Sequence, residues 1–324
     1  MMVQRRKVSI IGGGNVGTAC AYQIALKELA DVMVIDTPKR LDYVKGSILE
    51  IVESAPLHGF DVSMEVSSDL KDIEQSNVVI VTAGFARHPG MNREDLIEKN
   101  WEIVKSIAGH VRVHAPESIV IVVTNPLDAM VYTLWKITGF PVARVIGHSG
   151  SLDTSRYRTF IARELGVSVE EVHAIIIGSH GDQMVPLIRY TTVNAIPVTK
   201  LLPMDSIESC VERAKHGGTE IVKLKGGSAF YTPGISITHM VESILKDKKR
   251  LIPCAVYCNH EYHVGGLFIG VPCILGKKGV ERIVELDLND REKEAMHRSI
   301  EHVKGLVQIV DRLSARSESV AIKQ

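Results

Sequence analysis

The chain has 324 residues, of which 45% are hydrophobic and 23% charged, the composition of an ordinary globular protein with room for two cores. Its 38 basic residues equal its 38 acidic residues, so no overall field indicates nucleic acid or another highly charged partner. No apolar run approaches the roughly 18 residues of a membrane span, and the run after Arg5-Arg6-Lys7 is too short for a signal peptide. We therefore expect a cytoplasmic protein. Because no His or Cys set completes a site around the five scattered cysteines, we expect reduced, structural thiols and no metal.

The first half of the chain alternates short apolar runs with helical patterns. The expected elements are strands at 8–11, 32–35, 78–81 and 119–123, and a helix at 16–29. Each of these strands is apolar throughout, as expected of a parallel strand covered on both faces, and each ends in turn or polar residues. The alternation predicts an α/β fold with a Rossmann-type doubly wound parallel sheet, in which ligands bind beyond the C-terminal ends of the strands.

The second half has a different pattern and predicts an α+β domain. The expected elements are a strand at 175–177, hairpin strands at 268–271 and 273–275, a turn at 276–279, and a long helix from Asn289-Asp290. That helix carries an apolar stripe of Met296, Ile300, Val303 and Val307, and the polar tail after Leu313 is expected to fray. We place the division between a domain over 1–146 and a domain over 147–324.

A glycine motif follows the first expected strand. It consists of Gly12, Gly13, Gly14, Asn15, Val16 and Gly17, which fit G-x-G-x-x-G. A lone match is weak, but a strand precedes this one, a helix follows it, and Asp36 ends the next strand. The first glycine permits the tight turn, the third lets the backbone approach a pyrophosphate, and the last lets the helix pack against the sheet.

The acidic residue after the second strand sets the choice of cofactor. Asp36 would accept hydrogen bonds from the ribose hydroxyls of the adenosine and repel a 2′-phosphate, so NAD is favoured over NADP. Further candidates for lining the nicotinamide side are Asn100, Val123, Thr124 and Asn125.

Several polar segments then suggest chemistry: residues 82–93, 125–128, and 152–156 together with 178–182. With these motifs in this order, the chain resembles the lactate/malate dehydrogenase family from about Lys7 to the C-terminal helix. It most resembles the lactate-dehydrogenase-like (type 3) malate dehydrogenases. The resemblance implies that 1–146 binds NAD, that 147–324 binds substrate and carries the catalytic groups, and that a 2-hydroxy acid is interconverted with its 2-oxo acid.

The resemblance also implies roles for single residues. His180 is the implied acid/base, with a pKa that ordinarily lies near neutrality. Asp153 would pair with its other ring nitrogen and raise that pKa. Arg156 would hold the C1 carboxylate of the substrate in a bidentate fork, and Asn125 would hydrogen-bond the reacting oxygen or the substrate.

Two further arginines lie in a segment, residues 85–95, that is expected to close over the substrate. The family implies that Arg93 polarises the carbonyl in the transition state. Arg87 stands where malate enzymes usually have arginine and lactate enzymes glutamine. Because an unpaired arginine in a closed site is costly, Arg87 favours a dicarboxylate, and malate/oxaloacetate is the expected pair.

Some alternatives stay open. Ala229 and Met184 also fit a malate enzyme, whereas Asn92, His148 and Ser149 depart from the family pattern. The alternative activities are those of an L-lactate dehydrogenase or a broad 2-hydroxyacid dehydrogenase, and a catalytically silent NAD-binding protein is a third reading. Family members are usually homodimers or homotetramers, so we expect a homotetramer, with a dimer not excluded, and no nucleic-acid or membrane partner.

Overall fold

A computed structural model describes residues 5–85 and 93–321, with only the backbone of 93 and 318–321. The helices are α1 (Asn15–Leu26), α2 (Leu41–Glu53), α3 (Ala55–His58), α4 (Arg93–His114), α5 (Leu127–Thr138), α6 (Gly150–Leu165), α7 (Met204–Lys225), α8 (Tyr231–Leu245) and α9 (Asp290–Ala321). The strands are β1 (Lys7–Ile11), β2 (Asp31–Ile35), β3 (Met64–Ser67), β4 (Val78–Val81), β5 (Ile119–Val122), β6 (Val145–Gly147), β7 (Val172–His173), β8 (Ile176–Gly178), β9 (Met184–Pro186), β10 (Thr192–Val193), β11 (Ile196–Pro197), β12 (Arg250–Cys258), β13 (Leu267–Gly276) and β14 (Gly279–Ile283). Short 3-10 turns include η3 (Val142–Arg144), η5 (Ile188–Tyr190) and η6 (Val198–Lys200).

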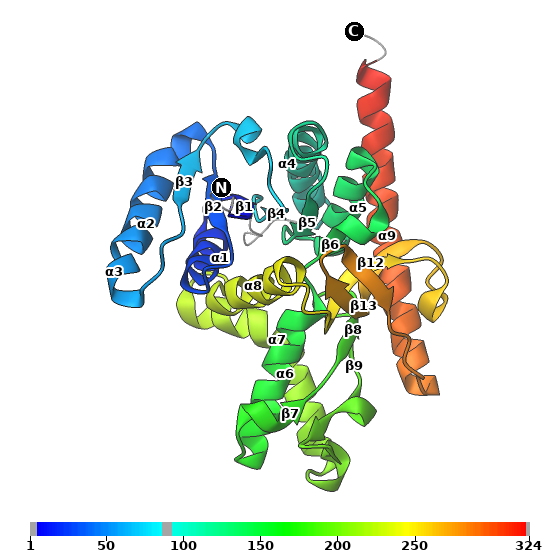
Figure 1. The fold of residues 1–324 in the computed structure, drawn as a ribbon. Coiled ribbons are helices and arrows are strands. Elements are labelled where there is room, and N and C mark those ends of the chain that lie inside the picture. Colours follow the sequence, from blue (N-terminus) through cyan, green and yellow to red (C-terminus); the bar gives the residue numbers. More distant parts are fainter. Residues whose placement is uncertain (1–4, 86–92, 322–324) are drawn as a thin grey trace.

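One long sheet runs through both halves of the chain. Its first part is parallel, in the order β3-β2-β1-β4-β5-β6, and its second part continues through the antiparallel strands β12-β13-β8-β9 (Figure 1). The two parts meet where Gly147 of β6 pairs with Ala255 of β12. The predicted fold class, a doubly wound Rossmann sheet followed by an α+β domain, is confirmed.

The parallel register brings the expected site segments to one edge of the sheet. Ile11 at the end of β1 is level with Ile35 of β2 and with Val81 of β4, and Val81 is in turn level with Val122 of β5. The segments that follow these four strands therefore lie side by side, as the sequence predicts.

Helices cover both faces of the parallel part, and alternate strand residues point to each face. Ile10 belongs to the same core cluster as Ile24 of α1 and Met240 of α8, whereas Val79 belongs to a second cluster with Val104 of α4 and Met130 of α5. Figure 1 shows α1, α2 and α3 on one side of the sheet and α4, α5 and α9 on the other. Full burial of such side chains stabilises the fold by about 1.5–3 kcal/mol each.

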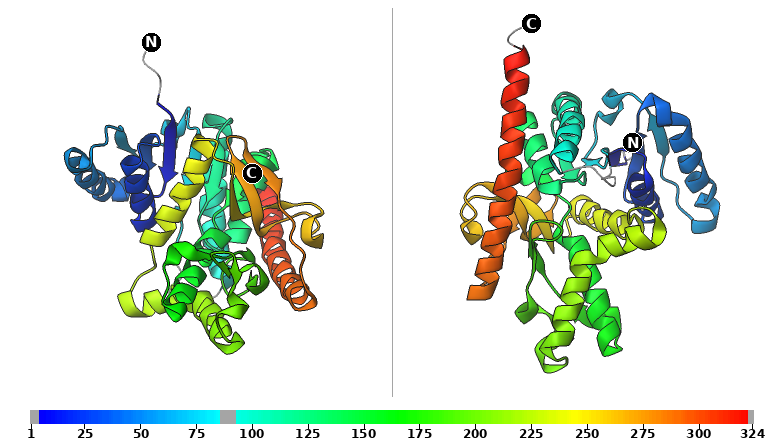
Figure 2. Two further views of the ribbon diagram at one scale, coloured as in Figure 1. Left: turned by 60° about the horizontal axis from the view of Figure 1, so that its bottom comes forward. Right: turned by 180° about the vertical axis from the view of Figure 1, so that it is seen from behind.

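Two expectations for the second half were wrong in detail. Residues 268–275 form one strand, not two, because β13 pairs with β12 continuously on both sides of Pro272. The predicted turn at 276–279 instead joins β13 to β14. The last helix also continues beyond Leu313 to Ala321, where Lys105 of α4 donates to the Ser317 hydroxyl (2.6 Å). Figure 2 shows α9 running along one side of the molecule, with its last turns extending past the neighbouring helices.

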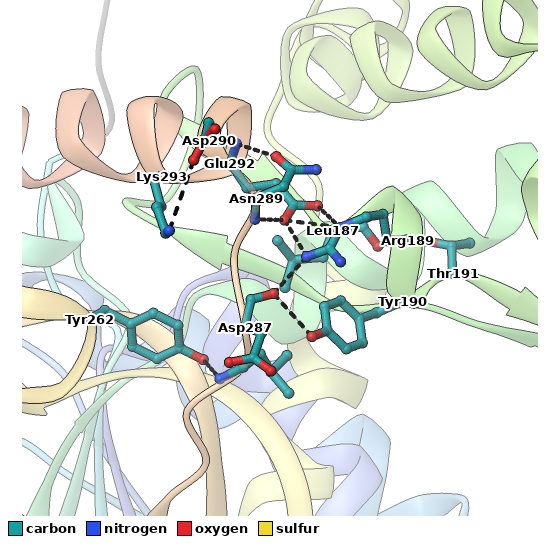
Figure 3. Close-up of polar contacts among 11 residues, drawn as sticks. Leu187, Arg189, Tyr190, Thr191, Tyr262, Asp287, Asn289, Asp290, Glu292 and Lys293 are labelled. Atoms are coloured by element: carbon teal, nitrogen blue, oxygen red, sulfur yellow. Dashed lines mark hydrogen bonds and ion pairs between the residues drawn. The ribbon is translucent and has the colours of Figure 1, made fainter.

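The start of α9 is fixed by a reciprocal cap and by η5 (Figure 3). The side chain of Asn289 accepts from Glu292 N (2.9 Å), and the Glu292 carboxylate accepts from Asn289 N (2.8 Å), which confirms the predicted cap. Arg189 also donates to Glu292 (2.8 Å) and to the carbonyl of Asp287 (2.6 Å). These bonds tie the segment after β9 to the helix that supports β8. In the described part of the chain, no helix is long and apolar enough to cross a membrane.

Candidate active site

The glycine turn after β1 has a shape that only glycine permits. Gly12 has a φ of +113°, and a Cβ there would lie 2.6 Å from Ala83 N and from the Thr82 hydroxyl. A Cβ at Gly17 would lie 2.0 Å from the carbonyl oxygen of Gly12, so α1 can approach the turn only without one. At Gly14 a Cβ would meet nothing within 4 Å. The turn is thus packed on its protein side and open at Gly14, at the N-terminus of α1, where a pyrophosphate needs room and free N–H groups.

Asp36 points back toward this turn. Its carboxylate accepts from Gly13 N (2.8 Å) and Thr37 N (2.7 Å), and Arg40 lies 3.6 Å away. The side chain is only 10% exposed. The structure thus places the acid beside the glycine turn, where ribose hydroxyls would follow a bound pyrophosphate. Arg40 belongs to the same cluster and was missed by sequence reasoning.

The other candidates for the nicotinamide side join the ends of β4 and β5. The buried Asn100 accepts from Phe85 N (2.7 Å) and donates to the carbonyls of Phe85 (3.1 Å) and Asn125 (2.6 Å). Thr124 donates to the carbonyl of Ala83 (2.6 Å). Val123 continues β5 by donating its N–H to Val81. The side chains of Asn100 and Thr124 therefore form hydrogen bonds with the backbone, and they connect the segments that follow β4 and β5, where Asn125 lies.

A hydroxyl from the start of the segment that the sequence singled out, residues 82–93, binds the same edge. Thr82 donates to the carbonyl oxygen of Gly12 (2.8 Å). It lies directly after β4, opposite the glycine turn. A hydroxyl residue at the end of the strand beside a glycine motif indicates such a contact with the turn.

His180, Asp153 and Arg156 come together although they belong to different elements. His180 follows β8, and the other two lie one turn apart on α6. Nδ1 of His180 is 2.8 Å from one carboxylate oxygen of Asp153, and Arg156 donates to the other (3.2 Å). Asp153 is only 3% exposed and lies in the first turn of α6, where the helix dipole favours a negative charge.

The charges in this cluster shift two pKa values in opposite directions. The negative charge of Asp153 raises the pKa of His180, although burial opposes the shift. Burial alone would raise the pKa of Asp153, but His180 and Arg156 outweigh it, so the pKa of Asp153 is lowered. An ionised carboxylate only accepts hydrogen bonds, so Nδ1 of His180 donates to it. That leaves Nε2 to exchange a proton with a substrate.

The loop that carries His180 is held in place through its neighbour Ser179. Ser179 donates its hydroxyl to Asp128 (2.7 Å), and its N–H donates to the Ser299 hydroxyl of α9 (2.6 Å). Asp128 is buried, and its charge also raises the pKa of His180. Asp128 lies in a segment singled out by its sequence, but nothing in the sequence showed that Ser299 supports this loop.

His148 is the family departure nearest to the cluster. It follows β6, is 4% exposed, and its Nε2 lies 2.9 Å from the Ser236 hydroxyl of α8. Burial, with a smaller contribution from His180, lowers the pKa of His148 to about 3. It is therefore uncharged at neutral pH. The same Ser236 is 2.8 Å from the hydroxyl of Ser151, so α8 is bonded to the start of α6.

Some candidate residues fall outside what the structure describes. Arg87, His88 and Asn92 lie outside the described residues, and of Arg93 only the backbone, which begins α4, is described. Residues 93–95 of the expected closing segment therefore form the start of a helix. Among the described residues, no group of three or more potential ligands could hold a metal ion.

The chain is similar to known proteins over nearly its whole length. Residues 6–147 match the model of the lactate/malate dehydrogenase NAD binding domain, and residues 150–311 match that of the lactate/malate dehydrogenase alpha/beta C-terminal domain. The chain is 48% identical to a malate dehydrogenase of Rhodopirellula baltica over 97% of this chain and 100% of the relative. It is also similar to the apo structure of malate dehydrogenase from Picrophilus torridus (46% identity, TM-score 0.93, 97% and 99% of the two chains). A lactate dehydrogenase from Cryptosporidium parvum, complexed with lactic acid and nicotinamide adenine dinucleotide, is 37% identical (TM-score 0.91, 96% and 99%).

Proposed function

We propose that this chain, which belongs to the lactate/malate dehydrogenase family, catalyses reversible, NAD-dependent hydride transfer between (S)-malate and oxaloacetate. The observation that carries the proposal is the contact of His180 with a buried Asp153 that also binds Arg156. It combines, in one place, a group that holds a proton, a charge that stabilises the protonated form, and a cation for a carboxylate.

Each residue of the cluster has one task in the reduction of oxaloacetate. When bound, NADH supplies the hydride that reduces the carbonyl carbon. His180 gives the proton on Nε2 to the carbonyl oxygen, while Asp153 keeps the ring oriented and stabilises the protonated form before transfer. The remaining N–H groups of Arg156 hold the C1 carboxylate, so the carbonyl faces His180. In the reverse direction, neutral His180 accepts the hydroxyl proton of malate.

The residues beyond β1 and β2 fit a bound NAD. The open space beside Gly14, at the N-terminus of α1, suits a pyrophosphate, and Asp36 stands where it would accept bonds from ribose hydroxyls. Asn100 and Thr124 would support the nicotinamide side through Asn125 rather than touch the ring.

The choice of substrate rests on Arg87 and Arg93. We assign Arg87 to the second carboxylate of oxaloacetate and Arg93 to the carbonyl. A second candidate activity, between lactate and pyruvate, is supported by the similarity to a lactate dehydrogenase. Replacing Arg87→Gln should move the preference in kcat/KM from oxaloacetate toward pyruvate, because glutamine removes the partner of the second carboxylate. An unchanged preference would contradict the assignment.

The assignment of His180 has its own test. His180→Asn should lower kcat by about 10²–10⁴-fold, the usual contribution of a positioned acid/base. Binding of NADH, followed by its fluorescence, should be retained, because the glycine turn and Asp36 lie on other strands. Turnover near the level of the unmodified enzyme would contradict the role.

We also propose that the chain forms a homotetramer, with a homodimer as the alternative, and that it acts in the cytoplasm. Large apolar side chains lie exposed on α2 and α3 and on α7 and α8. Leu57 of α3 is 87% exposed and Leu49 of α2 is 57% exposed. Leu224 of α7 is 81% exposed and Tyr231 of α8 is 70% exposed. Exposed apolar surface of this kind is typical of contacts between subunits, and the mass measured by light scattering decides between the two assemblies.

A further inference from the structure

A cavity of about 710 Å³ lies at the edge of the sheet opposite the candidate active site. The active-site segments follow the C-terminal ends of the parallel strands, whereas this cavity is lined by Asn77 and Ile119, at the N-terminal ends of β4 and β5. Arg6, directly before β1, lines it as well. Cavities of this size commonly hold small molecules. A ligand here would not compete with NAD for the glycine turn.

The charge of the lining is positive although the whole chain is neutral. Four basic side chains line the cavity (Arg6, Arg144, Lys277 and Lys278) against two acidic ones (Glu74 and Glu117), which leaves a charge of +2. The ends of α4 and α8 also face it, and each carries about −0.5 of charge from its helix dipole. The balance therefore remains positive.

One of the cations, Arg144, has a fixed position. Arg144 is only 21% exposed, donates to the carbonyl of Pro116 (2.7 Å), and lies over the ring of Phe140 (4.7 Å to its centre). The backbone of the turn that carries Lys277 is held by a bond from the Lys277 N–H to the carboxylate of Asp247 (3.0 Å), whereas the Lys277 side chain is 65% exposed, with its ammonium 4.0 Å from that carboxylate. Because Arg144 and the backbone of the turn are already positioned, binding an anion would mainly have to order the lysine side chains.

The acidic side chains of the cavity do little to offset these cations. Glu74 lies 3.1 Å from Nδ1 of His114 and can form an ion pair with it. Glu117 forms an ion pair with Arg144 (3.8 Å) but is 94% exposed, so solvent screens this pair and it offsets little of the charge of Arg144. Of the described residues, none forms an ion pair with the side chain of Arg6 or Lys278.

We propose that this cavity binds a small organic anion that carries two or more negative charges. The phosphate or carboxylate oxygens of such an anion would lie between Arg144 and the turn of Lys277 and Lys278, which line the cavity together. Arginine and lysine side chains bind both phosphate and carboxylate groups through charge-assisted hydrogen bonds. The site is independent of the activity proposed above, because it uses none of the same residues.

The test is isothermal titration calorimetry on the full-length protein saturated with NADH. Pyrophosphate and citrate are the two probes, at low ionic strength, and they distinguish phosphate from carboxylate recognition. The variant K277E/K278E reverses the charge of the turn. The matched control K200E/K293E reverses two exposed lysines on η6 and α9, neither of which lines the cavity.

The expected result is one site per chain for at least one probe, with affinity that falls as salt rises. K277E/K278E should weaken that binding by at least about tenfold, because two attractions become repulsions, and the control should leave it unchanged. Absence of binding of both probes would overturn the proposal. So would equal loss of affinity in the two variants, which would indicate only a general effect of charge.

Discussion

Two neighbouring glycines of α7 border the guanidinium of Arg156 and provide a matched pair of substitutions. A Cβ at Gly217 would lie 3.1 Å from Cδ of Arg156, which is closer than most real contacts. A Cβ at Gly218 would lie 3.6 Å from a terminal nitrogen of Arg156, an ordinary van der Waals distance. Gly217→Ala should therefore displace Arg156 by a few tenths of an ångström, whereas Gly218→Ala should leave it in place.

The size of the effect follows from that displacement. A misplacement of about 1 Å in a substrate-holding group can cost about a hundredfold in rate. A displacement of about half that distance should cost about half the free energy, which corresponds to a loss of about tenfold in kcat/KM. Both substitutions replace glycine by alanine inside a helix, which favours folding by about 0.5–1 kcal/mol. A loss of activity in Gly217→Ala should thus occur without a comparable loss of stability.

The assay is steady-state oxidation of NADH with oxaloacetate, together with thermal unfolding of each variant. We expect kcat/KM for oxaloacetate to fall about tenfold in Gly217→Ala and less than about twofold in Gly218→Ala, with KM for NADH unchanged in both. Equal activity of the two variants would refute the reasoning that Gly217 leaves room for Arg156. A collapse of the melting temperature would show that the fold, and not Arg156, was disturbed.

Two further predictions use the same structure. Asp153→Asn should lower the pKa of His180, because the charge that raises it is removed. Since reduction of oxaloacetate needs protonated His180, the alkaline fall of kcat/KM should move to lower pH. An unmoved pH profile would mean that another group titrates. Asn289→Ala should lower the free energy of unfolding by about 1 kcal/mol in urea titrations, since it removes the acceptor for Glu292 N, whereas Asn289→Asp should retain most of the stability.

The sequence predicted best those features that depend on neighbours along the chain. The parallel strands, the glycine turn and the cap at Asn289 each follow from a local pattern of apolar residues, glycines or capping groups. The pairing of His180 with Asp153 came from the family resemblance, and the structure brings these two side chains together.

Contacts between distant segments could not be predicted in this way. Ser299 supports the His180 loop across 120 positions of sequence, and Ser236 bonds to His148 across 88. The split expected within residues 268–275 was wrong because β13 pairs with β12 continuously through Pro272, and this pairing between distant segments is not visible in the local pattern. Packing against α4 likewise extends α9 past the point where its polarity predicted fraying.

The most direct test of the proposed activity compares two substrates. The purified protein is given NADH and either oxaloacetate or pyruvate, at matched concentrations and neutral pH, and kcat/KM is measured for each. An unpaired arginine in a closed site costs several kcal/mol, so we predict a preference for oxaloacetate of at least about a hundredfold. Equal or greater kcat/KM with pyruvate would contradict the assignment of malate and oxaloacetate as the substrate pair.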